Sequence, residues 1–123
     1  MTEVASGSMT DQACAIVRRY VEDALFGGDE RALRETVADE SLQERAWLFW
    51  AAFSERHLYG VDVIFASAEG DRVACHFTGS LVQVGPWVTA AMPAAGAGFV
   101  AAECTAIYML SEGRIANYRE TWR

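Results

Sequence analysis

Apolar residues recur at helical spacing through the first half of the chain. Cys14, Val17, Val21 and Leu25 lie three or four positions apart, and the pair Gly27–Gly28 ends the run. This spacing places the four side chains on one face of a helix, and glycine is typical of the position after a helix. The pattern predicts a first helix over residues 11–26.

Two further helices are predicted before residue 58. Asp29 can cap a short helix that ends at the acidic pair Asp39–Glu40. Ser41, with Glu44 three positions later, matches a capping box, and the residues that follow are apolar almost all round to about His57. A helix of that kind has to be covered on more than one side.

Residues 1–10 are small and polar and show no apolar period. We therefore expect a disordered N-terminal segment over residues 1–10 and a single domain over residues 11–123. A length of 123 residues, with 52% of them hydrophobic, suits one domain with a sizeable core.

After Gly60 the apolar residues alternate with polar ones, as in strands that are buried on one face. Such runs begin at Val61, Val73, Phe99 and Arg114, and an uncharged segment over residues 93–98, predicted to be a flexible loop, separates the second run from the third. Turn sequences join the runs within each pair: Glu69–Gly70–Asp71 and Ser111–Glu112–Gly113. Three helices followed by a four-stranded antiparallel meander predict an α+β fold with the sheet wrapped around the long helix.

Charge and hydropathy narrow the class of protein. The formal net charge is -7 and the longest basic run is the pair Arg18–Arg19, which disfavours nucleic acid as a partner. The longest apolar stretch, residues 46–53, is far shorter than the roughly 20 residues that cross a membrane, and the first residues show no signal-peptide pattern. We expect a soluble cytoplasmic protein without a membrane partner.

The sequence carries no motif for a metal or a cofactor. Cys14, Cys75 and Cys104 are odd in number and form no Cys-x-x-Cys pair, so neither a disulfide framework nor a zinc site is indicated. No His, Asp or Glu set has metal-ligand spacing, and neither a phosphate-binding glycine loop nor a Gly-x-Ser-x-Gly motif occurs. We expect no metal and a reaction that needs no cofactor.

Several short phrases follow one another along the chain. They are Arg19–Tyr20–Val21 before Gly27–Gly28–Asp29, Glu69–Gly70–Asp71–Arg72–Val73–Ala74, Thr78–Gly79, Gly85–Pro86–Trp87 ahead of Pro93–Ala94–Ala95–Gly96, and Glu112–Gly113–Arg114–Ile115. Their order over residues 11–123 resembles the nuclear-transport-factor-2-like superfamily, and within it the SnoaL-like polyketide cyclases. The resemblance implies a cone-shaped, curved antiparallel sheet wrapped around three N-terminal helices, the cystatin-like α+β barrel. It also implies a deep pocket for an apolar small molecule and a homodimer packed through the outer face of the sheet.

The end of the chain carries the strongest catalytic candidate. Residues 113–122 read Gly-Arg-Ile-Ala-Asn-Tyr-Arg-Glu-Thr-Trp and are similar to the Gly-Arg-Ile-x-x-Trp-Arg-Asp-Tyr-Phe ending of the epoxide-hydrolase and SnoaL-like branch. In that ending the acidic residue faces the pocket as acid or base, a role that the resemblance gives to Glu120. Alternation places Tyr118, Glu120 and Trp122 on one face of the strand. A solvent-exposed Glu paired with a nearby arginine is the alternative.

Two more residues could assist Glu120 in proton transfer. His76 lies about where the epoxide hydrolases carry an Arg, with Thr78 in place of their Asp, and its imidazole could relay a proton or polarise a carbonyl opposite Glu120. Tyr20 resembles the first-helix tyrosine of ketosteroid isomerase, whose hydroxyl stabilises an enolate oxygen. The alternatives are a histidine on the outer sheet face and a tyrosine that only packs in the core.

Substrate contacts are expected from aromatic side chains and from a second acid. The resemblance makes the long helix a wall of the pocket, so part of its aromatic stripe could hold a flat ligand, although such stripes are usually core. Glu103 either enters the pocket or rims the sheet. The substrate-binding candidates are Trp47, Trp50, Trp87, Glu103, Tyr118 and Trp122.

These features predict a cofactor-independent cyclase or isomerase that acts by acid/base catalysis on an apolar, polyketide-derived small molecule, with Glu120, His76 and Tyr20 as the catalytic candidates. Two alternatives stay open. One is an epoxide hydrolase or epoxide-opening cyclase, which the missing Arg and Asp disfavour. The other is a non-catalytic dimerisation domain that binds a hydrophobic ligand, because the fold alone does not choose a reaction.

Overall fold

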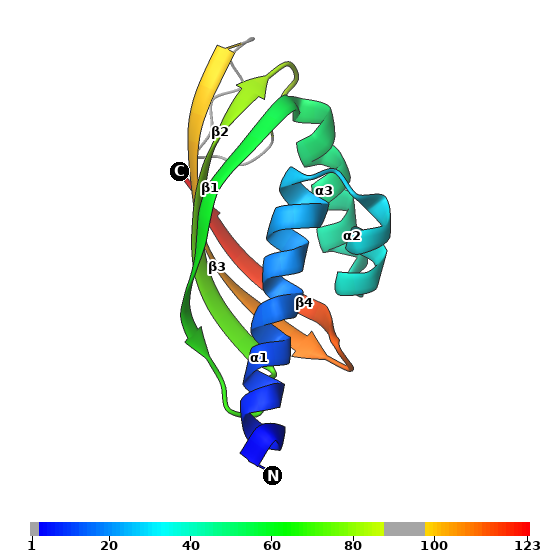
Figure 1. The fold of residues 1–123 in the computed structure, drawn as a ribbon. Helices are drawn as coiled ribbons and strands as arrows, with labels where there is room; N and C mark the ends of the chain where they lie inside the picture. The colour runs from blue at the N-terminus through cyan, green and yellow to red at the C-terminus, as the bar shows by residue number, and fades with distance from the viewer. Residues whose placement is uncertain (1–2, 88–97) are drawn as a thin grey trace.

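A computed structural model describes residues 3–87 and 98–123 of the chain (Figure 1). Three helical segments precede the strands: α1 (Glu3–Arg19) continued by the π-helix η1 (Tyr20–Phe26), α2 (Glu30–Thr36) and α3 (Glu40–Ala52). Four strands follow: β1 (Phe53–Ala66), β2 (Arg72–Gln83), β3 (Gly98–Ser111) and β4 (Arg114–Trp122). The predicted loop over residues 93–98 lies outside the described residues, except that β3 begins at Gly98.

The first helix begins at Glu3, so the backbone of residues 3–10 is helical where the sequence pattern predicts a disordered segment. Thr10 lies inside this helix. Its Oγ1 donates a hydrogen bond to the Ser67 carbonyl at 3.3 Å. The hydroxyl thus ties α1 to the turn between β1 and β2, a partner too far along the chain for a local pattern to reveal.

The first helix ends where the sequence predicts, at Phe26 before Gly27–Gly28, but its last segment widens into η1. A π-helix bonds each N–H to a carbonyl five residues back, which is less common than the α-helical pattern and leaves carbonyls for other donors. The Trp50 Nε1–H donates to the carbonyls of Ala24 and Leu25, both at 3.0 Å. The indole of α3 therefore holds the wide turn in place.

The third helix differs from its prediction at both ends. Its N-cap is Asp39, whose carboxylate accepts from the Leu42 N–H at 2.8 Å, and not Ser41. It ends at Ala52, and Phe53 begins β1 directly, so His57 lies on a strand and pairs with Ser80. Residues 53–58 have apolar positions compatible with a helix, yet hydrogen bonding to β2, about 25 residues away, stabilises the strand.

The four strands form one antiparallel sheet in the order β1-β2-β3-β4, which confirms the predicted meander. The last hairpin turns at Glu112 and Gly113, whose φ angles of 53° and 79° match the left-handed turn that suits the twist of two antiparallel strands. The sheet is curved and unclosed, and the helices lie against one face (Figure 1). This arrangement confirms the α+β fold class and the cone-shaped sheet around N-terminal helices.

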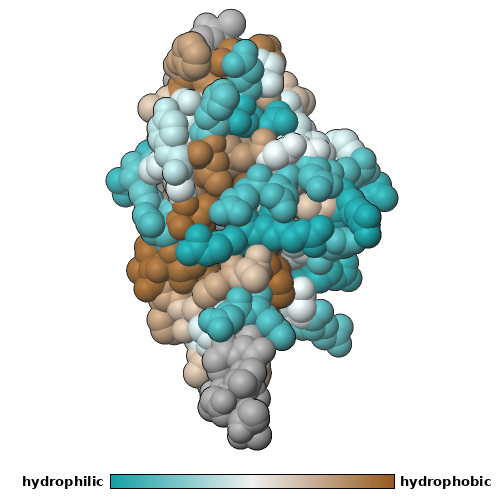
Figure 2. All heavy atoms as spheres, viewed as in Figure 1, coloured by the Kyte–Doolittle hydropathy of each residue, from teal (hydrophilic) through white to brown (hydrophobic). Residues whose placement is uncertain are grey.

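Aromatic side chains from helices and strands meet at the centre of the core. Ring centroids lie 5.0 Å to 6.1 Å apart, a range that favours tilted and edge-to-face contacts. The rings belong to Phe26, Phe49, Phe53, Phe77, Trp87 and Trp122. Figure 2 shows hydrophilic residues concentrated over α2 and α3, and hydrophobic residues gathered beside α1 and toward the sheet. No helix among the described residues is long and apolar enough to cross a membrane.

Candidate functional site

The site is built where α3 runs along β4. The end of α2 is bridged to β4 at Val37 and Ile115, and the Ala38 N–H donates to the Ile115 carbonyl at 2.8 Å. This anchor fixes the start of α3 beside β4. The same anchor sets the direction in which α3 runs along β4.

Beyond that anchor, α3 and β4 advance by similar distances. Four residues of helix advance about 6 Å, and two residues of strand advance about 6.6 Å. Helix residues four positions apart therefore meet alternate strand residues: Ser41 meets Tyr118, Arg45 meets Glu120 and Phe49 meets Trp122. The Glu120 side chain faces the helices, as do Tyr118 and Trp122, as the alternation along the last strand predicts.

Glu120 is held in the interior by three donors. Its side chain is 2% exposed. Oε1 accepts from the Arg45 Nε at 3.0 Å and from the Trp122 Nε1 at 3.3 Å, and Oε2 accepts from the Tyr108 hydroxyl at 2.7 Å. A carboxylate offers about four acceptor positions, so one position stays open on these contacts.

Arg45 connects this buried carboxylate to the surface. Its side chain is 27% exposed, far more than that of Glu120, and its guanidinium carbon lies 5.7 Å from the centre of the Trp87 ring. A cation over an aromatic face is attracted to it, so Trp87 helps to hold Arg45 in position. Burying a carboxylate costs several kcal/mol unless a cation and hydrogen bonds offset the cost, as they do here.

Two tyrosines, Tyr20 and Tyr108, complete the cluster of polar side chains around Glu120 on the inner face of the sheet. Tyr20, on η1, is buried, and its ring meets that of Tyr108 edge-on with centroids 5.5 Å apart. Burial raises the pKa of both hydroxyls well above the usual value, and the charge of Glu120 adds to the effect. Both tyrosines therefore keep their protons near neutral pH and can act as hydrogen-bond donors there.

His76 and Glu103 lie elsewhere, which corrects the prediction that they face the interior with Glu120. On β2 the neighbours Cys75 and Phe77 are buried against the helices, so His76 points to the outer face of the sheet. Its Nε2 lies 2.8 Å from Glu103 Oε2 on β3. Alternation shows which residues share a face but not which face is inside, so the sequence leaves both placements open for each residue, and the structure has the outer one.

The predicted aromatic residues separate into two groups. Trp122 and Trp87 are buried next to Glu120 and Arg45, and Tyr118 is half-buried with its hydroxyl 2.7 Å from the Ser41 Oγ. Trp50 contacts η1 and Trp47, whose side chain is 48% exposed. These contacts place Trp47 and Trp50 in the support of η1 and not among the described neighbours of the Glu120 carboxylate.

Two residues of the site were missed in the sequence. Arg45 could have been found from its place four residues after Ser41, once α3 was known to follow β4. Tyr108 lies directly opposite Tyr118 in the β3–β4 pairing, so it shares the face of Glu120. The two interior thiols do not extend the site: burial raises the pKa of Cys75 to about 12 and that of Cys104 further, so both stay protonated.

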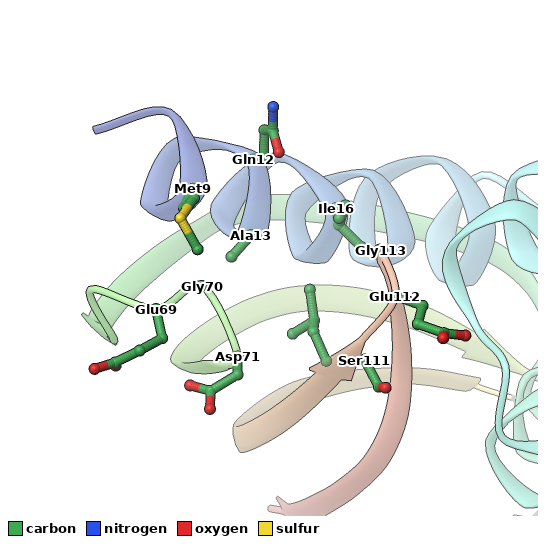
Figure 3. A pocket seen from close by; sticks show the side chains of 11 residues that line it. Met9, Gln12, Ala13, Ile16, Glu69, Gly70, Asp71, Ser111, Glu112 and Gly113 are labelled. Atoms are coloured by element: carbon green, nitrogen blue, oxygen red, sulfur yellow. The ribbon is translucent and has the colours of Figure 1, made fainter. Parts of the chain in front are cut away.

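Hollows lined by described residues open away from Glu120. One of about 250 Å³ lies between α1 and the two turns that join β1 to β2 and β3 to β4 (Figure 3). Its walls include Met9, Ala13, Gly70 and Ser111, and none of the predicted catalytic residues. Within residues 3–87 and 98–123, no group of three His, Cys, Asp or Glu side chains lies close enough to hold a metal ion.

Comparison with solved structures identifies the fold. A protein from Xanthomonas campestris pv. campestris, 19% identical, matches 91% of this chain and 90% of its own with a TM-score of 0.67. A protein from Silicibacter sp. TM1040, 16% identical, matches 91% and 89% with a TM-score of 0.69. A third, from Jannaschia sp. CCS1, 19% identical, matches 93% and 87% with a TM-score of 0.64.

The first two are named "putative polyketide cyclase" and the third "Putative SnoaL-like polyketide cyclase". This chain shares the α+β fold of these structures, which agrees with the fold that the resemblance in the sequence implies. No family model matches the sequence, and no curated protein matches it.

Proposed function

We propose that this protein is a cofactor-independent cyclase or isomerase that moves a proton on an apolar, polyketide-derived small molecule, with Glu120 as the acid/base. The observation that carries the proposal is the Glu120 carboxylate, buried beside Arg45 and two protonated tyrosines. An ionisable group in the interior is costly, and such groups are concentrated at functional sites. The names of the structural neighbours support the same class of substrate.

The geometry suits proton abstraction next to a carbonyl. The open acceptor position of Glu120 takes the proton from the carbon beside the carbonyl. The electron pair of that C–H bond forms a C=C bond, and the π pair of the carbonyl moves to its oxygen, which gives an enolate. The positive charge of Arg45 and the hydroxyl of Tyr20 favour this anion. The enolate carbon then attacks a second carbonyl, which closes a ring, or takes the proton back at another carbon, which isomerises the substrate. In cyclisation Glu120 returns its proton to the new alkoxide.

Replacing Glu120 by Gln tests this assignment. Glu120→Gln keeps the shape of the side chain and removes the base, so turnover should fall by about 100-fold or more. The measurement is product formation by mass spectrometry from a panel of linear poly-β-ketone and conjugated enone substrates. Glu103→Gln is the matched control, because Glu103 lies on the outer face, and it should leave turnover unchanged. Equal turnover by both variants would show that Glu120 is not the base.

Epoxide opening is a second candidate because of one observation. Arg45 brings a guanidinium to Glu120 from α3, although β2 carries His76 where the epoxide hydrolases have their Arg. A carboxylate held by Arg could activate water or an internal hydroxyl against an epoxide. Reaction of an epoxide substrate in ¹⁸O-labelled water distinguishes the two modes of opening, since hydrolysis places the label in the product and attack by an internal hydroxyl does not.

A non-catalytic ligand-binding domain is the remaining candidate. The enclosure of Glu120 favours it, because a carboxylate with 2% exposure and three donors is also what a structural ion pair looks like. In that case the ligand would bind without conversion, and Glu120→Gln would change the stability of the protein and not the fate of the ligand.

We also propose that the protein forms a homodimer through the outer face of the sheet. Phe65, Ala74 and Ile107 form one row across β1, β2 and β3, and the Phe65 and Ile107 side chains are 52% and 38% exposed. Tyr59 and Phe99, 70% and 79% exposed, add apolar area to the same face. Acids and bases alternate with them, among them Glu103 and the Arg119 of the next strand, so a second copy can meet this face with opposite charges in contact.

A further inference from the structure

Among the described residues, one buried polar atom in the aromatic cluster next to Arg45 has no hydrogen-bond partner. Trp87 is 3% exposed, and its Nε1 is the buried side-chain nitrogen that forms no hydrogen bond among the described residues. The other two tryptophans of the interior do form them: Trp50 donates to the carbonyls of η1, and Trp122 donates to Glu120. Buried donors in native proteins nearly always have a partner, so an exception calls for a reason.

The surroundings of Trp87 explain what partner it would suit. Its ring packs against Phe49, Phe53 and Trp122 at centroid distances of 5.3 Å, 5.7 Å and 5.9 Å, and Arg45 lies over the ring. The indole is thus fixed by apolar contacts on several sides. An indole N–H donates and does not accept, so it fits a carbonyl or other acceptor oxygen.

We propose that Trp87 Nε1–H donates a hydrogen bond to a carbonyl oxygen of the bound ligand, and that it selects flat carbonyl compounds over hydrocarbons of the same shape. The inference rests on the proposed ligand site at Glu120 and deepens it, because it names the group that the ligand must carry. The Arg45 guanidinium carbon lies over the same indole ring, 5.7 Å from its centre, so the positive charge of Arg45 favours electron density on an oxygen bound at this ring. Trp87 is therefore a positioning residue for the carbonyl beside which Glu120 acts.

The energetic reason for selectivity is the cost of an unpaired donor. A ligand without an acceptor leaves the buried Trp87 N–H without a partner, whereas a ketone supplies one. Sites with buried polar groups reject analogues that lack the matching group for this reason. We expect a preference on the order of 10-fold to 100-fold for a ketone over the matching hydrocarbon.

The test compares 9-fluorenone with fluorene, two flat tricyclic molecules that differ only in a carbonyl in place of a methylene group. Their dissociation constants are measured by calorimetry for the wild type, for Trp87→Phe and for Trp47→Phe. Trp87→Phe removes the N–H and keeps an aromatic ring, so it should bring the two constants within about 2-fold of each other. Trp47→Phe, on the exposed side of α3, should keep the preference of the wild type.

A second readout does not depend on how the Phe variant folds. In protein with ¹⁵N-labelled tryptophan, fluorenone should move the Trp87 Nε1–H resonance downfield and fluorene should not. Incorporating the isostere benzothienylalanine at position 87, which has sulfur in place of N–H, should abolish the preference with the ring size unchanged. Failure of fluorenone to bind the wild type, or a preference that survives the loss of the N–H, would overturn the proposal.

These outcomes are distinguishable from failure of the acid/base assignment. If Glu120→Gln converts substrate as fast as the wild type while the preference for fluorenone depends on Trp87, the ligand site stands and Glu120 is not its base. If Glu120→Gln is inactive and Trp87→Phe binds both probes as the wild type does, the base stands and Trp87 has no role in selectivity.

Discussion

At the scale of single residues, Glu120 shows how an interior charge is kept. Three donors from three positions surround it, one cationic and two neutral, and each comes from a different part of the chain: Arg45 on α3, Tyr108 on β3 and Trp122 on β4 itself. Removing the cation would leave the carboxylate buried with neutral donors only. The cost of such a change is dominated by the charge that is left behind, more than by the lost bond.

Arg45→Met should therefore destabilise the protein by about 3–5 kcal/mol, measured as the free energy of unfolding in urea. The double variant Arg45→Met, Glu120→Gln should recover much of the loss, because no charge is then left unpaired. Arg31→Met is the matched control: the Arg31 side chain is 84% exposed and pairs with Glu35 on the surface of α2, so its loss should change the free energy by less than about 0.5 kcal/mol. Equal effects of Arg45→Met and Arg31→Met would show that the buried ion pair contributes little to folding.

At the scale of elements, the sequence predicts best where the signal is local. Asp29 as a cap, Gly27–Gly28 as a helix stop and the turn at Glu112–Gly113 are all confirmed, because each depends on the conformation of two to four residues. The end of α3 was misplaced because residues 53–58 become a strand only through β2. Partners at such distances are absent from any local pattern.

The residues of the candidate site also differ in whether a local pattern can place them. Glu120, Tyr118 and Trp122 share a face by alternation alone, and the structure brings all three against α3. His76 could not be assigned in the same way, since which face of a strand is inside depends on where the helices pack. Arg45 could not be assigned from the sequence pattern, because its contact with Glu120 depends on α3 lying along β4.

The contact between β2 and η1 depends on Gly79, a position that no local sequence pattern marks as important. Gly79 is buried, and a Cβ at this position would lie 2.8 Å from Phe26 Cε2 and closer still to the His57 carbonyl. Gly79→Ala should therefore cost about 1–3 kcal/mol of unfolding free energy, because β1 and η1 would have to move away from β2.

Gly60→Ala is the control for that substitution. Gly60 lies on β1 near the same point of the sheet, and a Cβ there would meet no atom within 4 Å. Its unfolding free energy should stay within about 0.5 kcal/mol of the wild type. A Gly79→Ala variant as stable as Gly60→Ala would mean that the sheet and η1 are packed less closely than these distances show.

At the scale of the whole molecule, the two faces of the sheet differ in what covers them. The inner face is covered by helices of the same chain, while the outer face presents Phe65, Ile107, Tyr59 and Phe99 without a cover among the described residues. Large apolar side chains exposed together on one face mark an interaction surface more often than a solvated one. The formal net charge of -7 opposes association of two copies, so in the proposed dimer the apolar side chains of the outer face have to supply the attraction.

Placing charge among the apolar side chains of the outer face should therefore separate the two chains of the proposed dimer without unfolding either of them. The wild type should sediment as a dimer of a 13.5 kDa chain, and the double variant Phe65→Arg, Ile107→Arg should sediment as a monomer with an unchanged circular dichroism spectrum, because both side chains are already partly exposed. Leu48→Arg, which adds the same charge at an exposed position of α3, should stay dimeric. If the double variant remains a dimer, or the wild type is monomeric at micromolar concentration, the outer face of the sheet is not the interface, since two guanidinium groups per copy cannot be buried there against their own symmetry mates.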